Sequence, residues 1–305
     1  MKNSKYFKQA ELLIQVMPYV NMEKCFALKG GTAINLFIRN IPRLSVDIDL
    51  TYLLIEDRET TLRNISDALL RIADRIRIKL YGSKITSLYL SGSNHIFKLV
   101  VERLETKIII EPNLILRGSV FPPELRALSS KAEKLFEQSV STQVMSVADV
   151  YGGKICAALD RQHPRDLFDV KILFENEGIT EEIRKAFIVY LISNSRPINE
   201  LLNPNRLDIR SAYSEEFETM TEDAITYNAL IETREHLISS INSELTGSER
   251  EFLISVKQGI PNWTLLNLPN IEHLPSIKWK IINIGKMDPS KHKRQLESLK
   301  RVLAI

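Results

Sequence analysis

Apolar residues recur along the first half of the chain with two spacings, one typical of helices and one typical of strands. Residues 4–19 and 58–79 repeat apolar positions at the helical spacing, which predicts two amphipathic helices. A shorter helical pattern covers 33–39. Strand-like runs lie at 25–28, 46–53, 85–90, 96–102 and 107–111. This order of elements predicts an α/β or α+β domain with a mixed β-sheet flanked by helices.

The pattern becomes mainly helical from about residue 146 onward. Helices are predicted at 147–161, 165–177, 222–245, 248–258 and 290–303, and Thr180 opens a further one. The stretches 193–205 and 261–275 have no period and predict loops. Because 305 residues can form two cores, we expect a first domain over 1–145 and a mainly helical domain over 146–305.

The composition is that of an ordinary globular protein. Apolar residues make up 44% and charged residues 26%, which excludes a wholly disordered chain. No apolar run reaches the roughly 18 residues that a membrane span needs, and the N-terminus lacks an apolar signal core. Cys25 and Cys156 lie in apolar stretches without metal-like spacing, which favours two buried thiols. We therefore expect a cytoplasmic protein with no membrane partner.

The first candidate site combines a glycine pair with two aspartates. Gly30 and Gly31 stand between a predicted strand and a predicted helix, where the backbone can approach a phosphate closely and Thr32 adds a hydroxyl. Asp47 and Asp49 alternate with apolar residues, so both project from one face of a strand, about 6.5–7 Å apart. Two carboxylates so placed suit Mg²⁺, which takes carboxylate oxygens together with substrate phosphates. The combination predicts phosphoryl-transfer chemistry with two metals.

Glu111 is a third candidate carboxylate. It ends the apolar run 108–110, directly before Pro112. At the end of a neighbouring strand it could complete the metal site or act as the base for an attacking hydroxyl. A polar strand terminus explains the spacing equally well.

The second candidate site lies in the helical half of the chain. Lys154 and Arg161 are seven residues apart and share one face of a predicted helix, where a lysine could act on a triphosphate as a point charge. Asp166 falls in the first turn of the next helix, where a carboxylate is favoured by the helix dipole. Arg165 and Asp169 are spaced for an i,i+4 ion pair. Taken alone, these residues suit a structural role.

Together, these segments resemble the AbiEii/AbiGii toxin family. That family belongs to the polymerase-β-like nucleotidyltransferase superfamily and has members in type IV toxin–antitoxin and abortive-infection systems. The resemblance rests on GGTAINLF, RLSVDIDL, KIIIEPN with LRGSV after it, and VYGGKICAALDRQHPRDLFDVKIL, and covers roughly residues 25–180. It implies an α+β fold, with a polymerase-β-like nucleotidyltransferase core followed by a helical C-terminal domain.

The resemblance also implies roles for the residues of the first site. Gly31 and Thr32 match the first motif, where the superfamily more often has Gly-Ser, so the hydroxyl is kept. Asp47 and Asp49 match the metal-binding pair. Glu111 falls where the superfamily has its third carboxylate.

In the second site, Lys154 matches the nucleotide-contacting lysine of the third motif and Asp166 matches the acidic residue of the fourth. The implied cofactor is a pair of Mg²⁺ ions, with Mn²⁺ as a substitute. Characterised relatives transfer nucleotides from an NTP, in some cases to the 3′ end of tRNA, and an antitoxin encoded beside the toxin counteracts them. These are the expected substrate, acceptor and partner.

Positive charge concentrates near the C-terminus although the net charge is only +3. Such a basic end suits an RNA backbone, and Trp279 could stack on a base. A solvated helix face is the competing interpretation. The basic residues are Lys278, Lys280, Lys286, Lys291, Lys293, Arg294, Lys300 and Arg301.

Two other functions fit the same motifs. A small-molecule nucleotidyltransferase of the antibiotic-modifying type would use the same metal site with a compact acceptor pocket. A non-catalytic nucleotide-binding regulator would keep the fold alone, but the three carboxylates argue against it.

Overall fold

The computed structural model describes residues 4–221 and 224–305, which form two compact units. The first unit takes the described residues of Met1–Ser146 and Thr219–Asp223, and the second takes those of Val147–Glu218 and Ala224–Ile305. The predicted boundary between 145 and 146 lies beside the division after Ser146.

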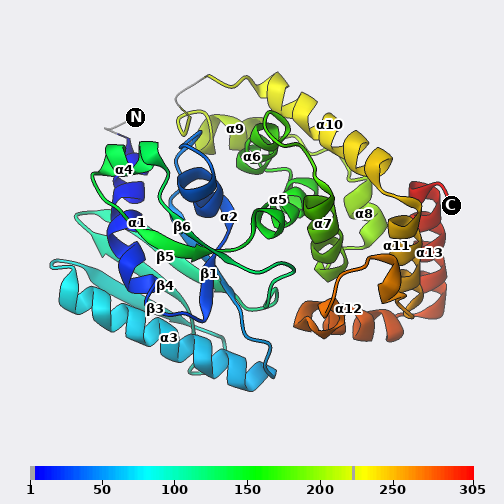
Figure 1. Cartoon of the computed structure of the whole chain (residues 1–305), viewed down its shortest axis with the longest axis horizontal. Coiled ribbons are helices and arrows are strands. Elements are labelled where there is room, and N and C mark those ends of the chain that lie inside the picture. Colours follow the sequence, from blue (N-terminus) through cyan, green and yellow to red (C-terminus); the bar gives the residue numbers. More distant parts are fainter. Residues whose placement is uncertain (1–3, 222–223) are drawn as a thin grey trace. The chain divides into compact units, whose positions relative to one another are not determined.

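A seven-stranded mixed β-sheet forms the centre of the first unit (Figure 1). Its spatial order is β3-β4-β5-β2-β1-β7-β6. The β2–β5 and β1–β7 pairs are parallel and the other pairs are antiparallel, so the predicted α+β class with a mixed sheet is confirmed. The strands are β1 (Phe26–Leu28), β2 (Asp47–Tyr52), β3 (Lys84–Tyr89), β4 (Ile96–Arg103), β5 (Thr106–Asn113), β6 (Glu124–Ala127) and β7 (Ser141–Val144).

The two faces of the central strands differ in polarity. On β2 and β5, Ile48 and Ile110 are fully buried and face the helices α1 and α3, which pack against β5 and β4. At alternate positions on the same strands, Asp47, Asp49 and Glu111 are only half-buried. This alternation is the period of two that the sequence shows, and it gives the sheet one apolar face and one polar face.

The helices of the first unit begin where the sequence places good caps. Ser4 caps α1 and Asp57 caps α3, each accepting a hydrogen bond from a backbone N–H in the first turn. The predicted helix at 33–39 begins earlier, at Gly30, and continues as a π-helix. The helices are α1 (Lys5–Val20), α2 (Gly30–Thr32), the π-helix η1 (Ala33–Ile38), α3 (Arg58–Lys79) and α4 (Ser130–Phe136).

Helices make up the second unit, as predicted. Helix α5 packs so closely against α7 that a Cβ atom at Gly152 would lie 2.7 Å from the backbone nitrogen of Phe187. The unit contains α5 (Val147–Arg161), α6 (Pro164–Phe174), α7 (Glu181–Ser193), α8 (Ile198–Leu202), α9 (Arg210–Glu216), α10 (Tyr227–Glu244), α11 (Gly247–Gln258), η2 (Trp263–Leu265), η3 (Ile271–His273), α12 (Pro275–Gly285) and α13 (Pro289–Leu303).

Some predicted boundaries are wrong. The predicted helix 165–177 ends at Phe174, and the loops at 193–205 and 261–275 contain α8 and two 3₁₀ turns. The predicted helix 222–245 is observed as α10, and its positions 222 and 223 lie outside the described residues. Strands β6 and β7 and helices α4, α9 and α12 were not predicted. Strands β6 and β7 have four residues each, α4 has seven and α9 buries no residue, so these four leave no clear hydrophobic period. Helix α12 has eleven residues and was missed although it buries Ile277 and Ile284.

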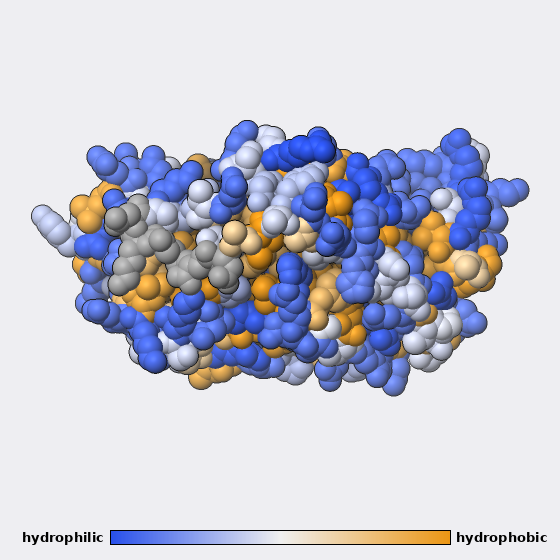
Figure 2. All heavy atoms as spheres, turned by 90° about the horizontal axis from the view of Figure 1, so that it is seen from above, coloured by the Kyte–Doolittle hydropathy of each residue, from blue (hydrophilic) through white to orange (hydrophobic). Residues whose placement is uncertain are grey.

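Among the helices of the described residues, none is both long and apolar enough to cross a bilayer. Hydrophilic residues cover most of the face drawn in Figure 2, with hydrophobic residues between them. Both cysteines are free thiols, Cys156 buried as expected and Cys25 only partly so. Burial raises the pKa of Cys25 to about 11 and that of Cys156 to about 12.

Candidate active site

The glycine turn after β1 lies directly against Asp49. Gly30 has a φ of +69°, a left-handed conformation that favours glycine. A Cβ atom at Gly30 would stand 2.5 Å from Oδ2 of Asp49, and one at Gly31 would stand 2.7 Å from Nη2 of Arg43. Neither position therefore accommodates a side chain without displacing a neighbour. The two glycines therefore allow the backbone of this turn to lie against the side chain of Asp49.

Thr32 ties this turn to the start of β2. Its hydroxyl is fully buried and hydrogen-bonds to the carbonyl oxygen of Asp47 at 2.5 Å and to Oγ of Ser45 at 2.9 Å. The expected hydroxyl is thus present, but its contacts are internal ones. In this arrangement Thr32 fixes the distance between the glycine turn and the aspartate strand.

The three candidate carboxylates lie on one face of the sheet. Asp47 and Asp49 alternate with buried residues on β2, and Glu111 of β5 is in register with Asp49 in the parallel pair. Residues in register on neighbouring strands project from the same face, so Glu111 is the lateral neighbour of Asp49. The sequence predicted the shared face of the two aspartates, and the register adds Glu111 to it.

Lys98 of β4 continues this row and was not foreseen. Its Nζ atom lies 2.8 Å from Oε2 of Glu111. Among the described residues no three His, Cys, Asp or Glu side chains are gathered closely enough to hold a metal ion, and Glu111 pairs with this lysine. The alternation of Lys98 with the buried Leu99 and Val101 was the sequence signal that could have identified it.

The donor set fits a hard divalent cation. Asp47, Asp49 and Glu111 supply carboxylate oxygens, the ligands that Mg²⁺ prefers, and no sulfur or imidazole ligand accompanies them on the row. All three side chains are half-buried, so solvent and a ligand can reach them. Glu111 would have to turn from Lys98 to join the two aspartates.

In the second unit, Lys154 and Asp166 form a buried ion cluster. Nζ of Lys154 lies 2.7 Å from Oδ1 of Asp166 and 3.0 Å from Oδ2 of Asp169. Nε of Arg161 lies 2.5 Å from Oδ2 of Asp166. Burial alone raises the pKa of Asp166, but the charges and hydrogen bonds of Lys154 and Arg161 outweigh it and hold the pKa well below its usual range.

The expected ion pair between Arg165 and Asp169 is wrong. Asp169 faces the interior and pairs with Lys154, whereas Arg165 pairs with Glu216 at 3.5 Å. The i,i+4 spacing permitted the pair, but the buried lysine on the neighbouring helix competes for the carboxylate. Asp169 is therefore a further member of the cluster that the spacing did not reveal.

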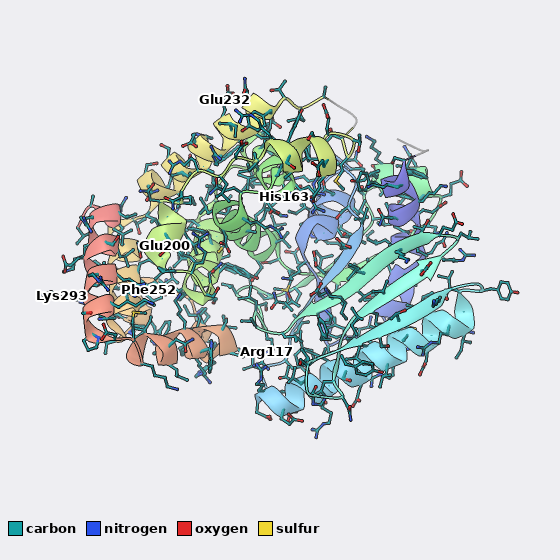
Figure 3. All side chains as sticks on the ribbon, turned by 180° about the vertical axis from the view of Figure 1, so that it is seen from behind. Arg117, His163, Glu200, Glu232, Phe252 and Lys293 are labelled. Atoms are coloured by element: carbon teal, nitrogen blue, oxygen red, sulfur yellow. The ribbon has the colours of Figure 1, made fainter. Side chains whose placement is uncertain are left out.

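The basic C-terminal residues divide into two groups. Nζ of Lys280 donates hydrogen bonds to the carbonyl oxygens of Asn194 and Arg196 at 2.6 and 2.9 Å, and burial lowers its pKa to about 8. It therefore holds the end of α7, and its expected place on a basic surface is wrong. The exposed basic side chains of α12 and α13 are Lys278, Lys291, Lys293, Arg294 and Arg301, and the exposed Lys286 directly follows α12. Lys293 is labelled on α13 in Figure 3.

Comparison with known proteins identifies the class of this chain. The chain is a nucleotidyltransferase toxin of a type IV toxin–antitoxin system, since a family model described as nucleotidyl transferase AbiEii toxin, type IV TA system, matches residues 11–242. It belongs to the AbiEii family. This membership confirms the resemblance and implies an NTP substrate and an antitoxin partner.

The fold comparison agrees with this membership. MenT4, a nucleotidyltransferase toxin from Mycobacterium tuberculosis H37Rv, superimposes with a TM-score of 0.61 at 15% sequence identity, covering 99% of this chain and 95% of MenT4. At this identity the match supports the fold alone. Comparison with curated proteins gave no match.

Proposed function

We propose that this toxin transfers a nucleoside monophosphate from an NTP to the 3′ end of a tRNA, with two Mg²⁺ ions held by Asp47, Asp49 and Glu111. The observation that carries the proposal is the row of carboxylates on β2 and β5 beside the turn at Gly30. Mn²⁺ would substitute for Mg²⁺, because both accept oxygen ligands.

In this proposal the glycine turn and the carboxylates of the first unit have different tasks. The backbone at Gly30, Gly31 and Thr32 accommodates the nucleotide phosphates beside Asp49. Divalent cations, when bound, would neutralise phosphate charge and acidify the acceptor hydroxyl.

The transfer itself balances without a further reactant. The 3′ oxygen of the acceptor forms a bond to the α-phosphorus, the bond from that phosphorus to pyrophosphate breaks, and the hydroxyl proton passes to solvent. Glu111 would help to hold the cation that acidifies this hydroxyl, so it must exchange its partner Lys98 for that cation.

The second unit supplies a cationic cluster. We assign Lys154 to the nucleotide phosphates and Asp166 to the support of that lysine, as the family motifs imply. The short distance between them supports a shared task. In this proposal residues 1–145 and 146–305 act as two functional domains in the cytoplasm.

Exposed basic side chains on α12 and α13 support RNA as the acceptor. Within the described part of the chain none of them pairs with a carboxylate, whereas Lys300 of α13 pairs with Glu297. Trp279 is 61% exposed and could stack on a base. If RNA binds here, its affinity should fall steeply with added salt, because binding releases counterions from the phosphate backbone. An RNA affinity that does not change with salt would contradict RNA binding at this surface.

The proposed activity is tested by incubating the protein with Mg²⁺ and each of four labelled NTPs. Total RNA, purified tRNA and a set of aminoglycosides serve as parallel acceptors, followed by sizing of the labelled product. The proposal expects label on tRNA-sized RNA together with released pyrophosphate. Label on the aminoglycosides alone would identify a small-molecule enzyme, and NTP binding without pyrophosphate release would identify a regulator.

A further inference from the structure

Two cations of the second unit share one buried carboxylate, but only one of them faces solvent. Asp166 accepts from Lys154 on one side and from Nε and Nη2 of Arg161 on the other. The side chain of Lys154 is 7% exposed and that of Asp166 is 1% exposed, whereas that of Arg161 is 64% exposed. The solvent-facing end of the cluster is therefore the guanidinium of Arg161.

The charge of Lys154 is already balanced inside the protein. It lies within 3.0 Å of both Asp166 and Asp169, and neither carboxylate is exposed enough to be stabilised by water. Moving this ammonium towards a triphosphate would leave a buried carboxylate without its cation, which is costly. The side chain of Arg161, by contrast, is 64% exposed, so its guanidinium can meet a triphosphate without leaving Asp166.

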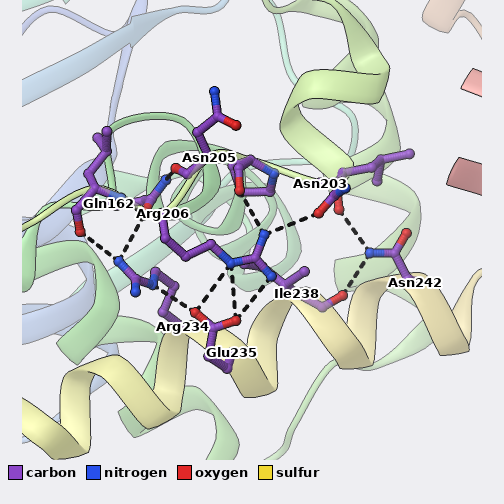
Figure 4. Close-up of polar contacts among 11 residues, drawn as sticks. Gln162, Asn203, Asn205, Arg206, Arg234, Glu235, Ile238 and Asn242 are labelled. Carbon is purple, nitrogen blue, oxygen red and sulfur yellow. Dashed lines mark hydrogen bonds and ion pairs between the residues drawn. The ribbon is translucent and has the colours of Figure 1, made fainter. Parts of the chain in front are cut away.

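The turn that follows Arg161 is held from two sides. Gln162 has a φ of +51° and is buried, its Nε2 donating to the carbonyl of Asn205 at 2.7 Å. Its Oε1 accepts from the backbone N–H of Leu207 and from Nη1 of Arg234 (Figure 4). A non-glycine residue in this conformation persists only where its surroundings fix it. Arg161 is therefore attached to a rigid turn.

The other side of this turn is fixed at the start of α6. Nδ1 of His163 accepts from the backbone N–H of Arg165, and its Nε2 lies 3.1 Å from Glu216. Asp166, one residue beyond, then holds the guanidinium of Arg161 through two nitrogens. A fork held in this manner loses little conformational entropy when it binds an anion.

We propose that Arg161 is a further nucleotide-binding residue, which contacts the triphosphate of the NTP, and that Asp166 and Lys154 act as positioning residues for its guanidinium. This inference rests on the proposed function, because an NTP is the substrate that supplies the triphosphate. It refines the assignment of Lys154 to the phosphates: the lysine acts through Asp166, and Arg161 is the side chain that reaches the ligand.

The test compares Arg161→Ala, Arg161→Lys and Arg210→Ala in the full chain. Arg210 is a matched control, because it is 74% exposed and pairs with Asp208 at 3.0 Å in the same unit. Binding of inorganic tripolyphosphate with Mg²⁺ is measured by calorimetry, and the KM for the NTP is measured in the transfer assay. Circular dichroism checks that each variant is folded.

The proposal expects Arg161→Ala to weaken tripolyphosphate binding and to raise the KM by about tenfold or more, as expected for a charge-assisted hydrogen bond. Arg161→Lys keeps the charge but loses the fork, so it should recover only part of the affinity. Arg210→Ala should match the wild type. Wild-type binding and KM in Arg161→Ala would overturn the inference. A wild-type protein that transfers no nucleotide would instead overturn the proposed function.

Discussion

Oδ2 of Asp49 lies 2.5 Å from the point where a Cβ atom at Gly30 would stand. The glycine turn and the aspartate strand thus meet without room for a methyl group between them. This contact brings the glycine turn and the aspartate pair, both matched to the family, into one place. It also makes the local geometry of the proposed site testable by a single added carbon atom.

Gly30→Ala should lose transfer activity by much more than its loss of stability explains. The new methyl group must displace Asp49, and the positive φ adds about 1 kcal/mol of strain. Gly82→Ala is the matched control, since Gly82 has a φ of +75° and nothing within 4 Å of its Cβ position. Both variants add the strain of a positive φ, but only Gly30→Ala displaces Asp49, so only Gly30→Ala should lose activity. Equal transfer activity in Gly30→Ala and Gly82→Ala would show that activity does not depend on the contact between Gly30 and Asp49.

Lys98→Met should lower the Mg²⁺ concentration needed for half-maximal activity. Lys98 holds Glu111 by an ion pair, so its removal leaves the carboxylate available to a cation. A partly exposed ion pair contributes up to about 1 kcal/mol, which corresponds to a shift of up to about fivefold. Mn²⁺ binding followed by electron paramagnetic resonance gives a second measurement.

Lys107→Met is the control for Lys98→Met, because Lys107 pairs with Glu102 on the same two strands at 3.4 Å. It should leave the metal dependence unchanged. A metal dependence in Lys98→Met equal to that of the control would contradict the place of Glu111 in the metal site.

Lys154→Met should destabilise the second unit strongly. The variant leaves Asp166 and Asp169 buried without their shared cation, which costs about 3–5 kcal/mol. Urea unfolding measures the loss, and Arg161→Ala should cost far less because Arg161 is itself 64% exposed and Asp166 keeps Lys154 as its cation. A Lys154→Met protein as stable as the wild type would mean that the cluster is not closed in solution.

The low pKa of Asp166 should make the fold sensitive to acid. A carboxyl with a folded pKa below its unfolded value of about 3.9 stabilises the protein above that value, and the contribution is lost as the pH falls further. Asp166→Asn should therefore flatten the fall of the unfolding free energy below about pH 4. Asp208→Asn, at an exposed ion pair, should keep the wild-type slope. If the unfolding free energy of Asp166→Asn fell with pH as steeply as that of the wild type, the low pKa of Asp166 would be contradicted.

Lys278 and Lys280 should behave differently although they are two residues apart. Lys280→Gln removes the ammonium that holds the end of α7 and should lower the melting temperature. Lys278→Gln removes an exposed charge, so it should leave the melting temperature unchanged and weaken RNA binding less than tenfold. Filter binding at two salt concentrations separates the two effects.

The fold could be predicted where the sequence has a local period. The alternation at 46–53 correctly placed both aspartates on one face, and Thr180 correctly marked the start of a helix. Strand β7 could not be predicted, because it consists of four residues whose pairing with β1 is non-local. Local patterns do not encode such a pairing.

The candidate site divides in the same way. Spacing and family motifs indicated each carboxylate separately, but they gave no register between β2 and β5 and hence no neighbour for Glu111. The ion pairs of Lys98 with Glu111 and of Asp169 with Lys154 were missed because the partners lie on other elements. The burial of Thr32 and Lys280 depends equally on tertiary packing.

The most direct measurement of the central claim is nucleotide transfer by Asp49→Asn. The variant keeps the size of the side chain and removes one carboxylate from the row shared with Glu111. With a labelled NTP, Mg²⁺ and tRNA, the wild type should transfer label and release pyrophosphate, while folded Asp49→Asn should transfer none. Transfer by Asp49→Asn at the wild-type rate would contradict a metal-dependent site on this strand.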